Sequence, residues 1–232
     1  MKILAAFLLT IMSMPSMQRS IFQSLNQPAA AGGATLTLAH STACSSTTCT
    51  VTTTTAGNAL LAVFPGVNAS GHITSVTGNA SGAFTHDSAC RFSGAGVSQE
   101  IDAYYLLAIT GGDTTVTIVD THGETPVIFE VHGATTWGGC TTLYTSTPTS
   151  LAPSATYSAA TNQFVAAAVC NDSLIDGVDS SSLPNSAAWT GYSAVAFGVG
   201  SAISSSSATY QYVGFNHGGD SKPAIGLTAV PK

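Results

Sequence analysis

Two groups of side chains in the sequence have the types and spacing that catalysis requires. Glu100 and Asp102 lie two residues apart, and paired carboxylates can hydrolyse a glycosidic bond as acid and nucleophile. Asp120, His122 and Glu124 repeat this spacing. On an extended strand these three would share one face, as metal ligands or as an acid–base pair.

Both patterns also have a simpler structural explanation. The residues that alternate with the first pair, Ile101 and Ala103, are apolar, which is typical of a strand with a polar outer face. Gly123 interrupts the second pattern between two predicted strands, which favours a hairpin loop. The sequence contains no GxSxG, HExxH or phosphate-binding loop. We therefore expect no catalytic residue and no enzymatic activity, and a glycosidase or esterase on the same fold is the least favoured alternative.

A third group lies in the segment CNDSLIDGVDSSS. Its candidate metal ligands are Asp172, Asp176 and Asp179, because hard oxygen ligands suit Ca²⁺. The spacing is not that of an EF-hand, and Asp and Asn also stabilise turns in solvated acidic loops. Calcium is thus the only cofactor that we consider possible from the sequence.

Aromatic side chains are the candidate ligand-binding groups. Trp137 lies in a predicted loop, where binding residues concentrate. Together with Trp189 and Tyr192 it could form a platform on which sugar rings stack, to which Tyr210 and Tyr212 could contribute. Large aromatic residues fill the cores of β-sandwiches more often. Carbohydrate binding is therefore an alternative function.

The five cysteines predict disulfides, since the chain has the features of a secreted protein described below. Cys44 and Cys49 flank the short segment SSTT, which a local bridge can close. Two of the remaining three can pair, and we favour Cys90 with Cys140, which leaves one thiol over. Zinc is disfavoured because the chain has no CxxC pair.

The composition excludes some partners. Only 7% of the 232 residues are charged and the formal net charge is -6, so Ser, Thr, Asn and Gly must cover the surface. Such a composition is typical of extracellular β proteins, fibres and surface coats. Nucleic acid is not an expected partner, because binding it requires clustered Lys and Arg.

The N-terminus resembles a secretory signal peptide. Lys2 precedes an apolar run of about a dozen residues, Ile3 to Met14. Spanning a bilayer needs about 20, so we do not expect an integral membrane protein. We assign residues 1–31 to this leader, with cleavage between 16 and 31, and residues 32–232 to one domain. The alternative is an N-terminal strand or helix that the mature protein keeps.

Short β-branched or aromatic segments, separated by Gly, Asn, Asp, Ser and Pro, recur along the rest of the chain. About eleven strands are predicted and no crossover helices are visible. The sequence therefore predicts an all-β fold, an antiparallel, jelly-roll-like β-sandwich. Residues 135–158, rich in Ser, Thr and Pro, are expected to form a long surface connection. The predicted strands are ATLTLAH, TCTVTTT, NALLAVF, HITSVTG, QEIDAYYLLAI, TTVTIV, PVIFEVHG, NQFVAAAVC, YSAVAFGVG, ATYQYVGFN and PAIGLTAV.

The order of these segments over about residues 34–230 is similar to a β-sandwich module of secreted bacterial proteins. The shared features are Thr-Ala-Gly-Asn before a strand, a Ser-Val-Thr turn, and an aromatic strand before Thr-Gly-Gly. The chain departs from the pattern at Gly78-Asn79-Ala80, which lacks an Asp, and at Val131-His132, where the module has Tyr-Ser. The resemblance implies a surface or adhesive module without an established enzymatic activity.

We therefore expect a secreted structural or adhesive surface protein that assembles into a fibre or lattice through β-strand contacts. Its partners would be other copies of itself, cell-surface components or glycans. One segment sharpens this expectation: in NALLAVF, residues 58–64, both faces of the predicted strand are apolar. Its own loops or another subunit must cover the second face.

Overall fold

The computed structural model describes residues 35–68, 73–93 and 99–144, and then segments 155–159, 163–170, 175–178, 190–194, 197–203, 208–212, 215–217 and 224–231. They belong to one compact unit, Thr35–Lys232. These residues contain nineteen strands and one 3-10 turn, η1 (Ser88–Cys90). The ladders pair antiparallel. The prediction of an all-β, antiparallel fold is confirmed.

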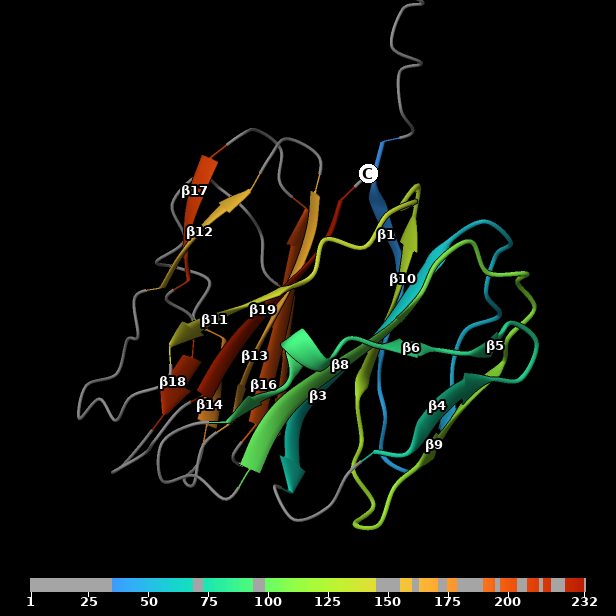
Figure 1. Cartoon of the computed structure of the whole chain (residues 1–232), viewed down its shortest axis with the longest axis horizontal. Helices are drawn as coiled ribbons and strands as arrows, with labels where there is room; N and C mark the ends of the chain where they lie inside the picture. Colours follow the sequence, from blue (N-terminus) through green and yellow to red (C-terminus); the bar gives the residue numbers. More distant parts are fainter. Residues whose placement is uncertain are drawn as a thin grey trace, which may run out of the picture. The chain divides into compact units, whose positions relative to one another are not determined.

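Three sheets carry most of the fold (Figure 1). The central sheet has the order β1 (Thr37–Ala43), β10 (Val127–His132), β3 (Ala59–Asn68), β8 (Gln99–Leu106), β6 (Thr85–His86), and β7 (Phe92–Ser93) also pairs with β8. The four-stranded sheet has the order β2 (Thr48–Thr50), β9 (Thr115–Val119), β4 (Ser75–Gly78), β5 (Gly82–Ala83).

The five-stranded sheet comes mainly from the second half of the chain. Its order is β11 (Cys140–Tyr144), β19 (Ala224–Pro231), β13 (Gln163–Cys170), β16 (Phe197–Ile203), β15 (Thr190–Ala194). Two short ladders complete the described structure: β12 (Ala155–Ala159) with β17 (Ala208–Tyr212), and β14 (Ile175–Val178) with β18 (Phe215–His217).

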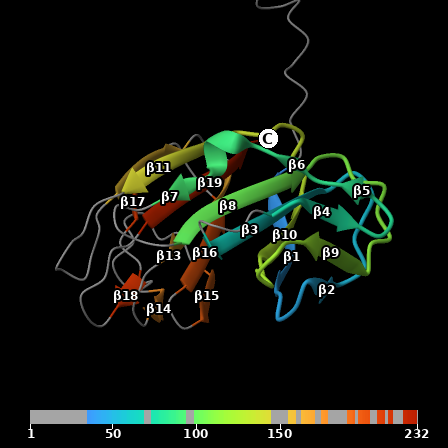
Figure 2. The ribbon, with the colours of Figure 1, turned by 60° about the horizontal axis from the view of Figure 1, so that its bottom comes forward.

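Strand β3 is buried on both faces, as its sequence predicts. Leu61 and Val63 belong to one core cluster, with Phe129 of β10 and Phe164 of β13. The alternating residues, such as Leu60, belong to a second cluster with β4 and β9. Figures 1 and 2 show these two sets of strands on opposite sides of β3 and β8. The chain itself therefore covers both faces of β3.

The structure corrects three details of the strand prediction. Residues 135–158 do not form one long connection, because β11 lies within them and β12 begins in them. The segments YSAVAFGVG and ATYQYVGFN each divide between two strands. The hairpin predicted around Gly123 is wrong: β9 pairs with β2 and β4, whereas β10 pairs with β1 and β3. That connection crosses from one sheet to another.

Both predicted disulfides are present, and each joins the central sheet to a different outer sheet. Cys44, directly after β1, is bonded to Cys49 in β2 of the four-stranded sheet. Cys90 in η1, which leads into β7, is bonded to Cys140 at the start of β11. None of the described residues forms a helix of the length and apolarity that spanning a bilayer would require.

Removing the two disulfides should destabilise the protein unequally. The closed loops span 50 residues for Cys90–Cys140 and 5 for Cys44–Cys49. Loop-closure entropy then predicts losses of about 4 kcal/mol for the Cys90→Ala/Cys140→Ala variant and about 2 kcal/mol for Cys44→Ala/Cys49→Ala. Urea denaturation of both double variants and the oxidised parent measures this difference. An equal or reversed order would contradict the expectation.

Candidate functional site

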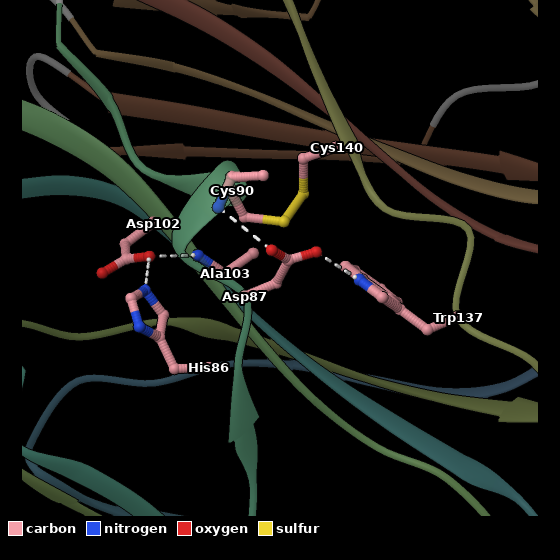
Figure 3. The surroundings of a disulfide bond; sticks show 8 residues. His86, Asp87, Cys90, Asp102, Ala103, Trp137 and Cys140 are labelled. Carbon is pink, nitrogen blue, oxygen red and sulfur yellow. Dashed lines mark hydrogen bonds and ion pairs between the residues drawn. A yellow bond between two sulfur atoms is a disulfide. The ribbon is translucent and has the colours of Figure 1, made fainter.

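The densest group of charged side chains lies beside the Cys90–Cys140 disulfide (Figure 3). Among the described residues, Arg91 is the only Lys or Arg. It follows η1, whose N-cap Asp87 accepts a hydrogen bond from the backbone N–H of Ala89 at 3.0 Å. This turn directs the Arg91 guanidinium toward β8, which carries the first predicted carboxylate pair.

Asp102 is the centre of this group. It is fully buried, and its Oδ2 lies 2.6 Å from Nη2 of Arg91. Its Oδ1 accepts hydrogen bonds from Nε2 of His86 and the backbone N–H of Ala103, both at 2.9 Å. The predicted polar outer face is wrong for Asp102, because the side chains of Arg91 and His86 lie against its carboxylate and it is not exposed to solvent. Glu100 lies 3.5 Å from Nε of Arg91.

Charge neutralisation accounts for the paired carboxylates. Burial alone would lower the pKa of Arg91, but the hydrogen bond and negative charge of Asp102 raise it above its ordinary value. A single guanidinium thus holds both Asp102 and Glu100. In the described structure, Arg91 therefore forms an ion pair with each of the two carboxylates.

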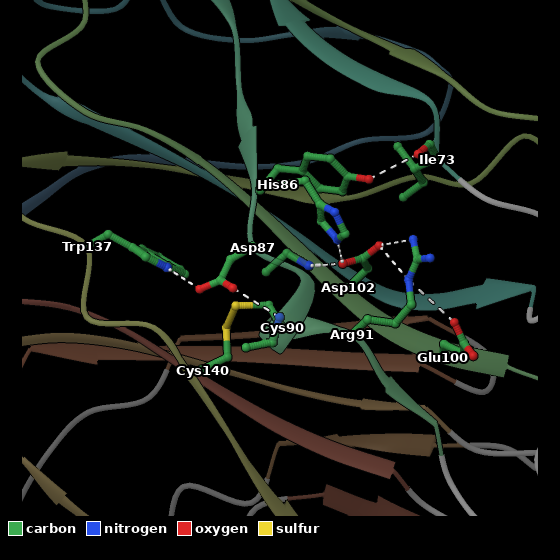
Figure 4. A network of polar contacts seen from close by, with 12 residues as sticks. Ile73, His86, Asp87, Cys90, Arg91, Glu100, Asp102, Trp137 and Cys140 are labelled. Carbon is green, nitrogen blue, oxygen red and sulfur yellow. Dashed lines mark hydrogen bonds and ion pairs between the residues drawn. A yellow bond between two sulfur atoms is a disulfide. The ribbon is translucent and has the colours of Figure 1, made fainter.

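His86 is held in one orientation (Figure 4). Its ring stacks on Tyr104 with centroids 4.6 Å apart, and the Tyr104 hydroxyl donates to the carbonyl of Ile73 at 3.1 Å. Burial, with the nearby charge of Asp102, raises the pKa of Tyr104 to about 12. A His–Asp pair can orient a general base. In the described part of the chain, however, the imidazole of His86 has no hydrogen-bond partner besides Asp102, so no Ser-His-Asp triad forms there.

Trp137 is fixed from two directions. Its Nε1 donates to Oδ2 of Asp87 at 2.9 Å, and its ring stacks on Tyr105 with centroids 4.4 Å apart. It also packs against the core cluster of β3. Trp189 lies outside the described residues, and of Tyr192 only the backbone in β15 is described. An aromatic platform for sugars therefore stays a prediction.

Asp113, which the sequence did not single out as a site residue, holds three turns together. Its buried carboxylate accepts hydrogen bonds from Thr54 Oγ1 at 3.0 Å and from the backbone N–H groups of Ala80 and Ser81 at 2.7 and 2.9 Å. The Ser81 hydroxyl also donates to it. Thr54, the residue just before Thr-Ala-Gly-Asn, thus meets Gly-Asn-Ala-Ser and Thr-Gly-Gly-Asp at one carboxylate, although these segments lie apart in the sequence.

Two glycines are required by this close approach. A Cβ on Gly78 would lie 2.5 Å from Oδ1 of Asp113. Gly111 has a φ of +78°, and a Cβ there would collide with the backbone nitrogen of Ala56. The turn motifs that carry the resemblance to secreted modules therefore have a structural reason in this chain.

Glu130 supports the same Thr-Ala-Gly-Asn turn from the other side. Its Oε1 accepts hydrogen bonds from the Thr55 backbone N–H at 2.7 Å and from Nδ2 of Asn58 at 2.6 Å. Oδ1 of Asn58 lies 2.9 Å from Nδ1 of His132. Glu130 is 2% exposed, and its Oε2 has no hydrogen-bond partner in the described structure. This buried carboxylate thus fixes a turn through one oxygen.

The remaining predicted sites are the group around His122 and the acidic segment around Asp176, and only the first lies wholly within the described residues. Asp120 accepts hydrogen bonds from the backbone N–H groups of His122 and Gly123, at 2.8 and 2.5 Å, and so caps an exposed turn. No cluster of three His, Cys, Asp or Glu that could hold a metal ion occurs among the described residues. Asp172 and Asp179 lie outside them, and only the backbone of Asp176 in β14 is described.

Comparisons with known protein families, with curated proteins and with solved structures find no match for this chain. The resemblance to secreted bacterial β-sandwich modules therefore stays a prediction from the turn motifs alone. What the geometry itself supplies is a set of buried carboxylates that connect turns and strands.

Replacing Asp113 should make folding less sensitive to acid. Burial alone would raise the pKa of Asp113, but the hydrogen bonds from Ser81, Ala80 and Thr54 outweigh it and lower the pKa below its ordinary value. Its contribution to stability is then present above the unfolded pKa of about 3.9 and is lost as pH falls through the lower folded pKa. Asp113→Asn should cost about 1–3 kcal/mol at pH 7 and much less at low pH.

Urea denaturation of Asp113→Asn and the parent between pH 7 and pH 2 measures this difference. Asp120→Asn, which alters a carboxylate that caps an exposed turn, is the matched control and should have a smaller effect at pH 7. A constant difference between Asp113→Asn and the parent at all pH values would refute the assigned role.

Arg91→Met should destabilise the protein strongly. It leaves Asp102 buried beside β3 without its cation, and breaking a buried pair costs about 3–5 kcal/mol. Adding Asp102→Asn should restore part of that loss, because the uncompensated charge is then gone. A double-mutant cycle by chemical denaturation measures the coupling, and additive effects would argue against it.

Proposed function

We propose that this protein is a secreted structural or adhesive module of a cell surface, and that its copies assemble through β-strand contacts. The observation that carries the proposal is the covalent connection of the three sheets. One disulfide joins the central sheet to the four-stranded sheet, and the other joins it to the five-stranded sheet. A body held in this way resists separation of its layers, as a surface or fibre component must.

The buried carboxylates support the same interpretation. Asp102, Asp113 and Glu130 each bind groups from turns or neighbouring strands. Buried charged groups are costly unless they are paired or hydrogen-bonded. Here their hydrogen bonds fix the connections between strands, which favours a role in rigidity.

The distribution of charge favours contact between copies. Residues 20–86 contain no Asp, Glu, Lys or Arg, although they supply strands β1 to β6. Sheet edges are usually protected against pairing by charged side chains, Lys above all. The strands of this half lack that protection, so strand pairing between copies is physically accessible to them.

Secretion is supported by the leader-like N-terminus and by the disulfides. Disulfides persist in oxidising compartments and are rare in the cytosol. An apolar run of the observed length behind Lys2 is typical of a signal peptide. Both features point to a protein that acts outside the cytosol.

Isolation of the protein from its source tests this function. We expect the material in the medium or on the cell surface to begin between residues 17 and 32. We further expect electron microscopy to show filaments or a lattice, and sedimentation to show a mass that grows with concentration. A chain retained in the cytosol would refute secretion. Monomers alone at high concentration would refute assembly.

A further inference from the structure

Strand β1 forms one outer edge of the central sheet. It is hydrogen-bonded to β10 alone, with His40 opposite Glu130 and Ala43 opposite Val127. The ladder continues one residue further, where the Cys44 backbone N–H donates to the carbonyl of Pro126 at 3.0 Å. In the described part of the chain, no hydrogen bond reaches the edge of β1 that faces away from β10.

This edge is already held in an extended conformation. Leu36, just before β1, is buried at 2% exposure and belongs to the core. Cys44, just after it, is tied to β2 by a disulfide. The ladder is irregular between Leu38 and His40 but regular from His40 to Ala43. A strand fixed at both ends loses little conformational freedom when another strand adds to it.

The side chains of β1 do not oppose such an addition. The strand reads TLAHSTA and contains no charged residue and no proline. Thr37, Ala39, His40 and Ala43 are exposed, and all but His40 are small. The bulge near Leu38 is a protection that edge strands commonly use, but it leaves the regular part unprotected.

The other edge strands of the central and four-stranded sheets are shorter than β1 and offer fewer backbone groups for pairing. Strands β5, β6 and β7 have two residues each and β2 has three, whereas β1 has seven. Because each added strand residue contributes backbone hydrogen bonds, β1 is the edge among these that can bind an extended partner best.

We propose that β1 pairs antiparallel with β1 of a second copy, so that two central sheets become one continuous sheet across a two-fold axis. This inference rests on the proposed function, since it names the strand through which copies meet. A second copy fits because an isologous contact needs a self-complementary surface. Strand β1 contains no Asp, Glu, Lys or Arg, and Glu130 of the neighbouring β10 is only 2% exposed, so no formal charge on β1 opposes the approach of another β1.

Charged side chains introduced on β1 test this pairing, because they would repel each other across the two-fold contact. In the mature secreted chain, Ala39→Lys/Ala43→Lys would place four lysines in the two-fold contact, on positions that are exposed in the single copy. We expect analytical ultracentrifugation to show at least a tenfold increase in the dimer dissociation constant. Thermal unfolding of the variant monomer should match that of the parent.

Thr117→Lys/Val119→Lys is the matched control. It adds the same charge on exposed positions of β9, which has a neighbour on each side, β2 and β4. This variant should dimerise like the parent. Hydrogen exchange should also show concentration-dependent protection of residues 37–43 in the parent and the control, but not in the edge variant.

The outcomes separate the two proposals. If the parent assembles but the edge variant assembles equally well, or if residues 37–43 gain no protection, pairing through β1 is wrong while the proposed function stands. If the parent stays monomeric at the highest soluble concentration, both this inference and the assembly part of the proposed function fail.

Discussion

The burial of both faces of the central sheet is the constraint on which the rest of the structure depends. Strands β3 and β10 carry apolar side chains on both faces, so neither face can be left exposed to solvent. The chain must therefore supply two covers from opposite halves of its sequence. The four-stranded sheet comes from strands before residue 120, and the five-stranded sheet from strands after residue 139. A third layer is the consequence of a two-faced strand.

This arrangement also explains where the carboxylates lie. A strand inside a layered sheet cannot direct a polar residue to solvent on either face, so Asp102 and Glu130 are buried along with their apolar neighbours. Each then requires partners within the chain, because an unpaired buried charge is costly. Arg91 and His86 supply them for Asp102, and a turn supplies them for Glu130. Local chemistry that resembles a catalytic site follows from layer packing.

Short-range patterns in the sequence predict most of the strands and the Cys44–Cys49 disulfide, because alternation, turn residues and close cysteine spacing are local. Cys90 and Cys140 lie 50 residues apart, so no local signal supported the choice of that pair. The predictions for Asp102 and Gly123 are wrong for one reason. Their surroundings depend on which strands pair, and strand pairing is not determined by the neighbouring sequence. The pairing of β9 with β4, rather than with β10, brings Asp113 to Ser81. The only signal for that contact was three turns rich in Gly and Asn, whose common partner appears only in three dimensions.

Charged residues are distributed unequally along this chain, and this distribution limits which interactions each part can make with a partner. Residues 20–86 offer hydroxyl, amide and backbone groups without a formal charge, whereas the acidic residues begin at Asp87. Screening by salt weakens contacts between charges and leaves backbone hydrogen bonds and shape complementarity largely unaffected. A partner that meets the first half of the domain is therefore recognised through its backbone and shape. For such a surface, an extended strand is a better match than a charged ligand, because the sheet edge presents donors and acceptors at a fixed spacing.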